Sequence, residues 1–175
     1  MAVNRGKDFE DVFKTSCMLV KDVSIDRVHD QTTKFAGSSN ICDFIAYKKP
    51  YEYYFECKSV HGNTLSIFSN PKKDKNGKLK GFYGNISDKQ WQGLTEKSKI
   101  NGVCAGVVVW WVEKDVTMFI PIKALNELRE QGKKSIRFDD KHKLFIKLTG
   151  KKKRVFFEYD MKSFFNTIEK KGRKE

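Results

Sequence analysis

The chain has 175 residues, 39% of them hydrophobic, which is the size and composition of one globular domain and argues against a disordered chain. Its 35 Lys and Arg residues outnumber its 22 Asp and Glu residues, and the net charge of +13 favours a polyanionic partner, nucleic acid first, over an acidic small molecule. Residues 1–9 are polar and no run approaches the ~20 apolar residues of a membrane span, so we expect a cytoplasmic, nucleoid-associated protein that does not enter a membrane.

The first half of the chain is expected to contain a helix, a hairpin and a long loop. Apolar residues between 5 and 20 recur at the spacing of an amphipathic helix. Segment 43–58 is predicted to form two strands, rich in Tyr, Phe and Ile, around the turn Lys48-Lys49-Pro50-Tyr51. Residues 61–85 are rich in Gly, Asn, Lys and Pro, which predicts a long, exposed and basic loop.

The second half is expected to mix helices with strands. The capping-box sequence Ser87-Asp88-Lys89-Gln90 starts a predicted helix that runs to about residue 99. Strands are predicted at 103–112 and 116–120, a helix at 123–131 ending near Gly132, a hairpin between 143–149 and 154–159, and a last helix at 161–171. These elements predict one α/β (α+β) domain over residues 1–170, with a mixed sheet flanked by helices and a basic tail at 171–175.

The four cysteines, Cys17, Cys42, Cys57 and Cys104, stand far apart in the sequence. They form no Cys-x-x-Cys pair, which argues against a structural zinc site. Without a secretory signal we expect reduced and mostly buried thiols.

The predicted hairpin brings two carboxylates together. A turn centred between Lys49 and Pro50 pairs residues whose numbers sum to 99, which sets Asp43 directly across from Glu56. Side chains two apart on a strand share a face, so Lys58 points the same way as Glu56. A slip of one residue in the turn would put Glu56 on the opposite face from Asp43, and the two charges of the second strand would then be ordinary solvated side chains.

Two carboxylates held across a strand pair repel each other unless a proton or a cation lies between them. Their hard oxygen atoms suit Mg²⁺ or Mn²⁺. Such a cation would polarise a phosphate oxygen and activate a water molecule, while Lys58 would neutralise charge that develops on the phosphate. Asp43, Glu56 and Lys58 thus predict a centre that cleaves phosphodiester bonds.

An Asp followed at a distance by Glu-x-Lys on adjoining strands resembles the PD-(D/E)XK nuclease superfamily. Within it, the chain is similar to the RecU-type Holliday junction resolvases through Gly6-Lys7-Asp8-Phe9-Glu10, the step Lys89-Gln90, Gly132-Lys133-Lys134-Ser135-Ile136 and Tyr159-Asp160-Met161-Lys162. The resemblance spans roughly residues 5–168 in order. It departs from the family in the sequence before Asp43, Asn40-Ile41-Cys42, and in the length of segment 61–85.

The resemblance implies a restriction-endonuclease-like fold and further site residues. Glu10 matches the acid of the first helix that contributes to metal or water binding, although a first-turn Glu also stabilises a helix dipole. Gln90 matches a Gln that touches the water or the phosphate, although it equally completes the capping box. Segment 23–39 takes the place of a projection that enters the junction centre, and paired cuts in a two-fold symmetric junction imply a homodimer.

Clusters of cations are the candidates for sequence-independent phosphate contact in branched DNA during recombination and repair. The candidates are Arg27, Lys34, Lys72, Lys73, Lys75, Lys78, Lys151, Lys152, Lys153 and Arg154, with Asn40, His29 and His61 as weaker ones. Two alternatives stay open. One is another PD-(D/E)XK nuclease, of the restriction or repair type, and the other is a basic DNA-binding module without catalysis.

Overall fold

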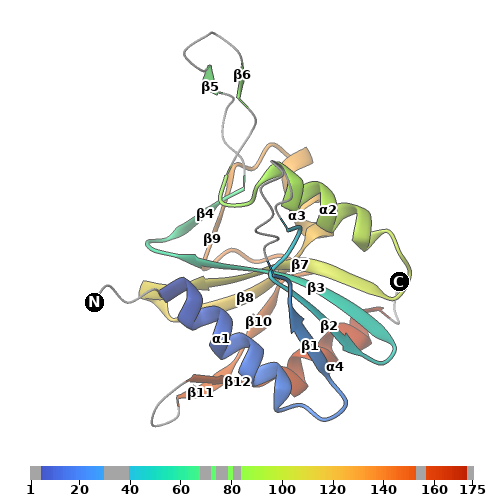
Figure 1. Cartoon of the computed structure of the whole chain (residues 1–175). Coiled ribbons are helices and arrows are strands. Elements are labelled where there is room, and N and C mark those ends of the chain that lie inside the picture. Colours follow the sequence, from blue (N-terminus) through green and yellow to red (C-terminus); the bar gives the residue numbers. More distant parts are fainter. Residues whose placement is uncertain are drawn as a thin grey trace.

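The computed structural model describes residues 5–29, 40–67, 72–73, 79–80, 84–152 and 157–172. Within them a six-stranded mixed sheet lies between two layers of helices (Figure 1). The α-helices are α1 (Arg5–Met18), α2 (Asp88–Ser98), α3 (Ile122–Glu130) and α4 (Met161–Gly172). In spatial order the strands of the sheet are β1 (Ser24–Arg27), β2 (Phe44–Lys48), β3 (Tyr51–Val60), β7 (Val103–Trp111), β8 (Val116–Pro121) and β10 (Ile146–Leu148).

Three short strand pairs lie outside this sheet. They are β4 (Thr64–Ser66) with β9 (Ser135–Arg137), β5 (Lys72–Lys73) with β6 (Leu79–Lys80), and β11 (Gly150–Lys152) with β12 (Phe157–Tyr159). A 3-10 turn, Val112–Lys114, joins β7 to β8. The mixed sheet with helices on both sides confirms the predicted α+β fold class.

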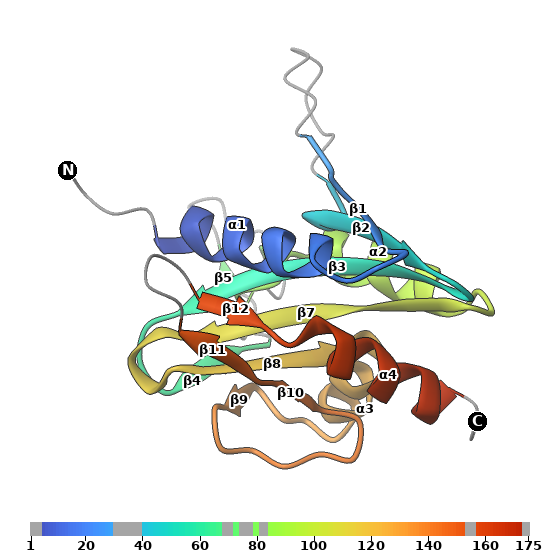
Figure 2. The same ribbon diagram turned by 90° about the horizontal axis from the view of Figure 1, so that it is seen from below.

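Each face of the sheet is covered by its own pair of helices. Figure 2 shows α1 and α4 on the near side of the sheet, with α2 and α3 behind it. Phe13 of α1 and Phe165 of α4 belong to one core cluster, whereas Leu94 of α2 and Leu125 of α3 belong to the other. A sheet covered on both faces needs apolar residues in succession along its central strands, which explains the nearly continuous apolar sequence of β7.

Among the ladders that the described residues form in this sheet, the central one, between β3 and β7, is parallel. Strand β3 runs parallel to β7 in a register that pairs Glu56 with Val107 and Lys58 with Val109. Helix α2 lies in the connection between these strands, as a crossover between parallel strands requires. The neighbouring ladders of the sheet are antiparallel.

Most predicted elements are present with small changes in length. The helix predicted at 5–20 ends at Met18, and the helix predicted at 123–131 is followed by Gly132 at φ +77°, a conformation that glycine adopts without strain. None of the four cysteines forms a disulfide, and Cys17, Cys42 and Cys57 are buried as expected. No helix in the described ranges is both long and apolar enough to cross a membrane.

Two predictions of local structure are wrong, and a third is not tested. The late hairpin does not pair 143–149 with 154–159, because β10 pairs with β8 while β12 pairs with β11, which lies in the expected turn. Segment 61–85 is not an exposed loop throughout, since β4 pairs with β9 and buries Leu65. Segment 23–39 begins with the edge strand β1, and its residues 30–39, expected to project into a junction, lie outside the described residues.

Candidate active site

The hairpin β2–β3 has the register that the sequence predicts. Phe44 pairs with Phe55 and Lys48 with Tyr51, so the paired numbers sum to 99 throughout the ladder. Asp43 precedes Phe44 in the sequence and lies one step beyond the pair of Phe44 with Phe55, at the position opposite Glu56. The alternative of a one-residue slip is therefore wrong.

At Asp43 strand β2 leaves strand β3. The Asp43 backbone N–H donates to Phe55 O (3.0 Å). The Asp43 carbonyl oxygen accepts from the N–H of Val28 (2.8 Å), which lies beyond the end of β1. The Asp43 Oδ2 atom accepts the backbone N–H of Cys57 at 2.7 Å. The Asp43 carboxylate therefore accepts a backbone N–H of β3 that is no longer paired with the backbone of β2. This hydrogen bond fixes the orientation of the carboxylate next to the Glu56-Cys57-Lys58 segment.

Glu56 is buried and carries two polar neighbours on one of its oxygens. Its side chain is 2% exposed, and its Oε1 lies 2.6 Å from Lys58 Nζ and accepts Gln90 Nε2 at 2.6 Å. The other oxygen, Oε2, is buried without a hydrogen-bond partner. The interpretation of Glu56 as a solvated surface charge is wrong, and an unpartnered buried carboxylate oxygen is costly enough to need an explanation.

Burial raises the pKa of Glu56 from its ordinary value of 4.5 to about 7, against the lowering effect of the adjacent Lys58 ammonium. The charge of Asp43 raises it further, and the hydrogen bonds from Lys58 and Gln90 lower it. Glu56 consequently changes charge near neutral pH. Strongly shifted pKa values cluster at functional sites, so the shift of Glu56 supports a functional role for this carboxyl group.

Gln90 completes the capping box of its helix and also contacts Glu56, while its contact with the water or the phosphate stays a prediction. Its Oε1 accepts the Ser87 backbone N–H at 3.0 Å and completes the capping box of α2, while its Nε2 donates to Glu56. The close approach of α2 depends on Gly93, because a Cβ there would lie 2.4 Å from Ile41 Cγ2, in the segment just before Asp43. The cap therefore fixes the amide that orients the buried carboxylate.

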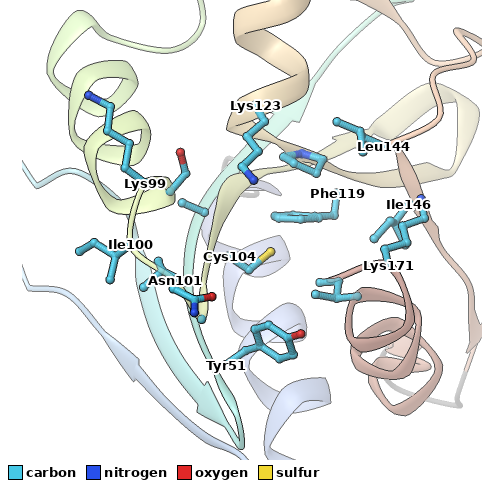
Figure 3. Close-up of a pocket in the computed structure, with 16 residues that line it drawn as sticks. Tyr51, Lys99, Ile100, Asn101, Cys104, Phe119, Lys123, Leu144, Ile146 and Lys171 are labelled. Carbon is cyan, nitrogen blue, oxygen red and sulfur yellow. The ribbon is translucent and has the colours of Figure 1, made fainter. Parts of the chain in front are cut away.

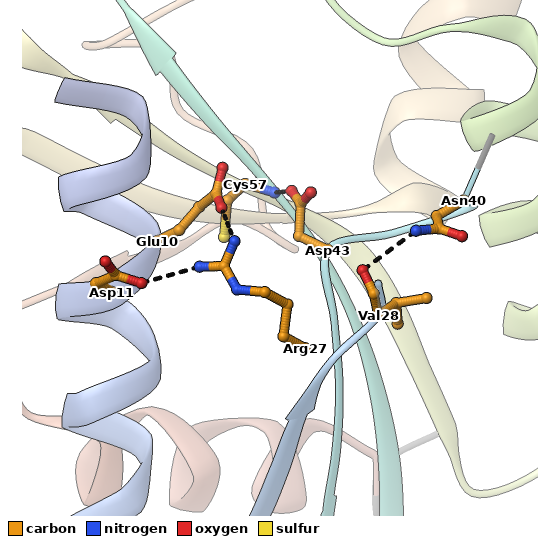
Figure 4. A network of polar contacts seen from close by, with 7 residues as sticks. All are labelled: Glu10, Asp11, Arg27, Val28, Asn40, Asp43 and Cys57. Atoms are coloured by element: carbon orange, nitrogen blue, oxygen red, sulfur yellow. Dashed lines mark hydrogen bonds and ion pairs between the residues drawn. The ribbon is translucent and has the colours of Figure 1, made fainter. Parts of the chain in front are cut away.

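Glu10 reaches the site from α1 but is held by an arginine. Arg27 of β1 donates from one nitrogen to Glu10 Oε2 at 2.6 Å and from the other to Asp11 Oδ1 at 3.0 Å (Figure 4). The Arg27 guanidinium lies 5.0 Å from the centre of the Phe44 ring. Burial raises the pKa of Glu10, the Asp43 charge raises it further, and Arg27 lowers it. Asp43 thus lies within electrostatic reach of both Glu10 and Glu56.

The donor set fits a cation that is shared with a substrate. Among the described residues, no three His, Cys, Asp or Glu side chains are grouped closely enough to enclose a metal ion. Mg²⁺ commonly binds through one or two protein carboxylates and completes its shell with water and substrate phosphates. Asp43 and Glu56 supply two such carboxylates, and Glu56 Oε2 is an oxygen with no other partner, so these residues could hold Mg²⁺ or Mn²⁺.

The predicted DNA-contacting residues are only partly placed. Arg27 is engaged with Glu10 and Asp11, whereas Lys151 and Lys152 are exposed on β11. His29 is exposed, His61 lies 3.8 Å from Glu113, and Asn40 donates to Val28 O. The backbones of Lys72 and Lys73 form β5. Their side chains, and all of Lys34, Lys75, Lys78, Lys153 and Arg154, lie outside the described residues.

Two contributors to the site were missed in the sequence. The Cys57 backbone N–H that holds Asp43 was overlooked because alternation assigns only the Cys57 side chain, which is buried on the other face. Gly93 gives a weak signal, a glycine inside a helix, which usually indicates a close approach. Both act through backbone geometry, which residue types alone do not report.

No protein-family model matches the sequence, and no curated protein matches it. Among solved structures, a similar chain is Hjc of Archaeoglobus fulgidus, described as a Holliday junction resolvase from an archaeal hyperthermophile. The two chains are 16% identical with a TM-score of 0.42, and the match covers 68% of this chain and 76% of that chain.

Proposed function

We propose that the protein is a divalent-metal-dependent DNA endonuclease. The observation that carries this proposal is Glu56, buried at 2% exposure, with one oxygen held by Lys58 and Gln90 and the other without a partner beside Asp43. The order of helix α1, strands β1 to β3, helix α2 and strand β7 is consistent with the nuclease superfamily that the sequence resembles. The net charge of +13 favours DNA as the substrate.

The residues divide the chemistry between them. Asp43 and Glu56 would hold a Mg²⁺ or Mn²⁺ ion, which supplies polarisation of the phosphate and a lower pKa of water. Lys58, through an ammonium already within 2.6 Å of Glu56, neutralises negative charge that develops on the phosphate. Gln90 keeps the Glu56 carboxylate oriented through the capped start of α2, and Glu10 adds a carboxylate on the α1 side.

The substrate that we propose is a four-way junction, cut by a homodimer in paired nicks. One chain offers a single set of Asp43, Glu56 and Lys58, whereas a two-fold symmetric junction has two equivalent strands to cut. A dimer supplies the second site in the matching orientation. This finer assignment rests on the resemblance to RecU-type resolvases, with recombination and repair as the setting.

Cleavage assays with synthetic four-way junctions, linear duplexes and single strands, each with and without Mg²⁺, test the proposal. We expect Mg²⁺-dependent cleavage that is fastest on the junction and leaves symmetric nicks. Mixing wild-type protein with an excess of Asp43→Ala protein should leave junctions nicked on one strand, because each mixed dimer has one working site. Equal cleavage of duplex and junction would replace the resolvase by a restriction or repair type of nuclease, and cleavage of no DNA would leave a DNA-binding module.

Metal binding has its own test that needs no activity. Mg²⁺ or Mn²⁺ should raise the thermal unfolding midpoint of the wild-type protein, because a ligand that binds only the folded state stabilises it by mass action. The effect should be largest above pH 7, where Glu56 is ionised. The Asp43→Asn protein should lose it. An equal shift in both proteins would place the metal elsewhere.

A further inference from the structure

A second candidate binding site lies at the opposite end of the sheet. A cavity of about 400 Å³ opens where β3 and β7 begin, between the loop after α2, the start of α3 and the end of α4 (Figure 3). Tyr51, in its wall, precedes Glu56 by five residues on β3, a separation of about 17 Å at the rise of a strand. Tyr51 packs on the α1 and α4 face, whereas Glu56 contacts Gln90 of α2 on the other face. The cavity is thus separate from the candidate active site.

The lining combines an apolar wall with positive charge. Phe119, Ile146 and Ile168 form part of the wall, and the cavity volume lies within the range of about 300–1,000 Å³ that is usual for small-molecule sites. Among the described residues, the lining contains three lysines, Lys99 after the end of α2, Lys123 of α3 and Lys171 of α4, and no Asp or Glu. A molecule in this cavity therefore meets apolar surface and net positive charge together.

The lysines come from distant parts of the sequence, and Figure 3 shows the Lys99 ammonium directed away from the cavity at its rim. Figure 3 shows the Lys123 nitrogen and the Cys104 sulfur directed toward the space beside Phe119. Lys171 Nζ donates to Lys143 O at 2.8 Å, which holds the end of α4 at the cavity. Lys99 pairs with Glu96 at 2.7 Å, but both side chains are more than 60% exposed, so this pair exchanges readily with another anion.

We propose that this cavity binds a small organic anion, an apolar body that carries a phosphate or a carboxylate group. The apolar wall buries the body, and the ammonium groups of Lys123 and Lys171 neutralise the charge. An anion without the apolar body would gain only exposed ion pairs, and an uncharged body would gain nothing from the lysines. The proposal does not depend on nuclease activity.

Fluorescent probes that differ by one charge test it. Anilinonaphthalene sulfonate should bind the folded wild-type protein with increased emission, and salt should weaken this binding. The uncharged N-phenylnaphthylamine, of similar shape, should bind at least about fivefold more weakly. Equal binding of the two probes, or no binding of the sulfonate, would overturn the proposal. The Asp43→Ala protein should bind the sulfonate as the wild type does, so this result stands apart from the test of the nuclease.

Replacement of the lysines locates the bound probe. Lys123→Gln and Lys171→Gln should each weaken sulfonate binding roughly two- to fivefold, the size expected for partly exposed ion pairs, and the double variant about tenfold. Lys162→Gln, an exposed lysine on α4 outside the lining, is the matched control and should leave binding unchanged. Thermal unfolding checks that all variants fold. Unchanged binding in a folded double variant would contradict the proposal.

Cys104 supplies an independent readout, because it lines the cavity and is partly exposed while Cys17, Cys42 and Cys57 are buried. Bound ligand should slow the reaction of Cys104 with a maleimide, measured by mass spectrometry. The same protection assay with deoxyadenosine monophosphate and with decanoate then distinguishes two classes of anion, a nucleotide phosphate with an aromatic base and an aliphatic carboxylate. Protection of Cys104 by one of them supports the proposal and identifies the class. Protection by neither, and none by the sulfonate, would overturn it.

Discussion

The two faces of strand β3 differ in what they bury. On one face Phe55 packs among aromatic rings, 5.1 Å from Phe13 and 5.6 Å from Phe119 between ring centres. On the other face Glu56, at 2% exposure, contacts Gln90 of α2 and also Lys58, whose side chain is 24% exposed. The same strand therefore buries only uncharged side chains of its core on the first face, whereas on the second it buries a charged pair between Tyr54 and Val60.

The difference shows which face serves stability. Burying aromatic surface stabilises the fold, whereas a buried ion pair often contributes no more than apolar residues of the same volume would. For Glu56 the contribution to stability is lower still, because its Oε2 atom is buried without a hydrogen-bond partner. Phe55 and the rings around it thus account for part of the stability, and the pair of Glu56 and Lys58 calls for a functional explanation.

The largest effects should come from removing the charges of the polar face. Asp43→Ala and Lys58→Ala should each slow junction cleavage by roughly 10²–10³-fold or more, because the first removes a proposed metal ligand and the second removes the cation that neutralises the phosphate. DNA affinity should stay within a few fold, since it comes from the lysine-rich surface. Glu52→Gln, which alters a carboxylate at the start of the same strand, is the control and should keep activity. Junction affinity that falls in parallel with activity would contradict this division.

The apolar face should show the opposite pattern. Phe55→Ala removes a fully buried ring and should lower the free energy of unfolding by about 3–5 kcal/mol, measured by urea denaturation. Phe55→Leu should cost less, because more of the volume is kept. Where these proteins remain folded, cleavage per folded molecule should change little. Loss of activity without loss of stability would mean that the two faces are not separable.

Glu56→Gln should stabilise the protein while abolishing cleavage. The pKa of Glu56 is raised from 4.5 to about 7, so between these pH values the folded state binds a proton that the unfolded state has lost. Stability therefore falls as pH rises through this window, and the full cost of about 3 kcal/mol is present above it. The variant lacks the titrating group and should unfold roughly 6–12 °C higher at alkaline pH. Equal midpoints there would show that Glu56 is not destabilising.

Local signals predicted the parts of the fold that local chemistry determines. The capping box before Gln90 and the glycine after α3 marked the ends of helices, and the proline turn set the register that brings Asp43 opposite Glu56. Alternation along β3 correctly separated Phe55 from Glu56. It missed the burial of Glu56, because a face covered by α2 cannot be distinguished from a solvated face in the sequence of one strand.

Elements that depend on distant partners could not be predicted in this way. Strands β1, β4 and β9 have three or four residues each, and β4 finds its partner some 70 residues later in the chain. A segment that short carries no measurable periodicity. The Arg27 ion pair with Glu10 and the cavity around Lys123 were missed for the same reason, since each joins elements that only the tertiary fold brings together.

A smaller effect should follow from removing positive charge around β5. Combined replacement of Lys72, Lys73, Lys75 and Lys78 by Ser should weaken DNA binding and flatten its salt dependence, by about one unit of slope per lost phosphate contact. Folding and the cleavage rate at saturating DNA should be unchanged. The same replacement of four exposed lysines elsewhere, Lys21, Lys49, Lys147 and Lys162, is the charge-matched control. Equal slopes in both proteins would show that the segment around β5 does not contact DNA.

The smallest effect concerns the acid on the α1 side of the site. Arg27 lowers the pKa of Glu10 against burial and the charge of Asp43, whereas Asp11 raises it. Arg27→Met should therefore raise the pKa of Glu10 and Asp11→Asn should lower it, as carbon-detected NMR titration of the carboxyl would report. Because a carboxyl with a raised pKa stays protonated to higher pH, Arg27→Met should also shift the acid limb of cleavage to higher pH.

The opposite signs of the two variants separate a local electrostatic role from a general loss of structure, which would move both in the same direction. Arg27→Lys keeps the charge but loses the forked pair of donors to Glu10 and Asp11, so its pKa shift should be smaller than that of Arg27→Met. If Arg27→Met instead weakens junction binding and leaves the pKa of Glu10 in place, Arg27 acts on DNA directly. The Arg27 guanidinium, which lies over the Phe44 ring, would then contact a phosphate at the end of β1. The position of Glu10 would in that case be fixed by α1 alone.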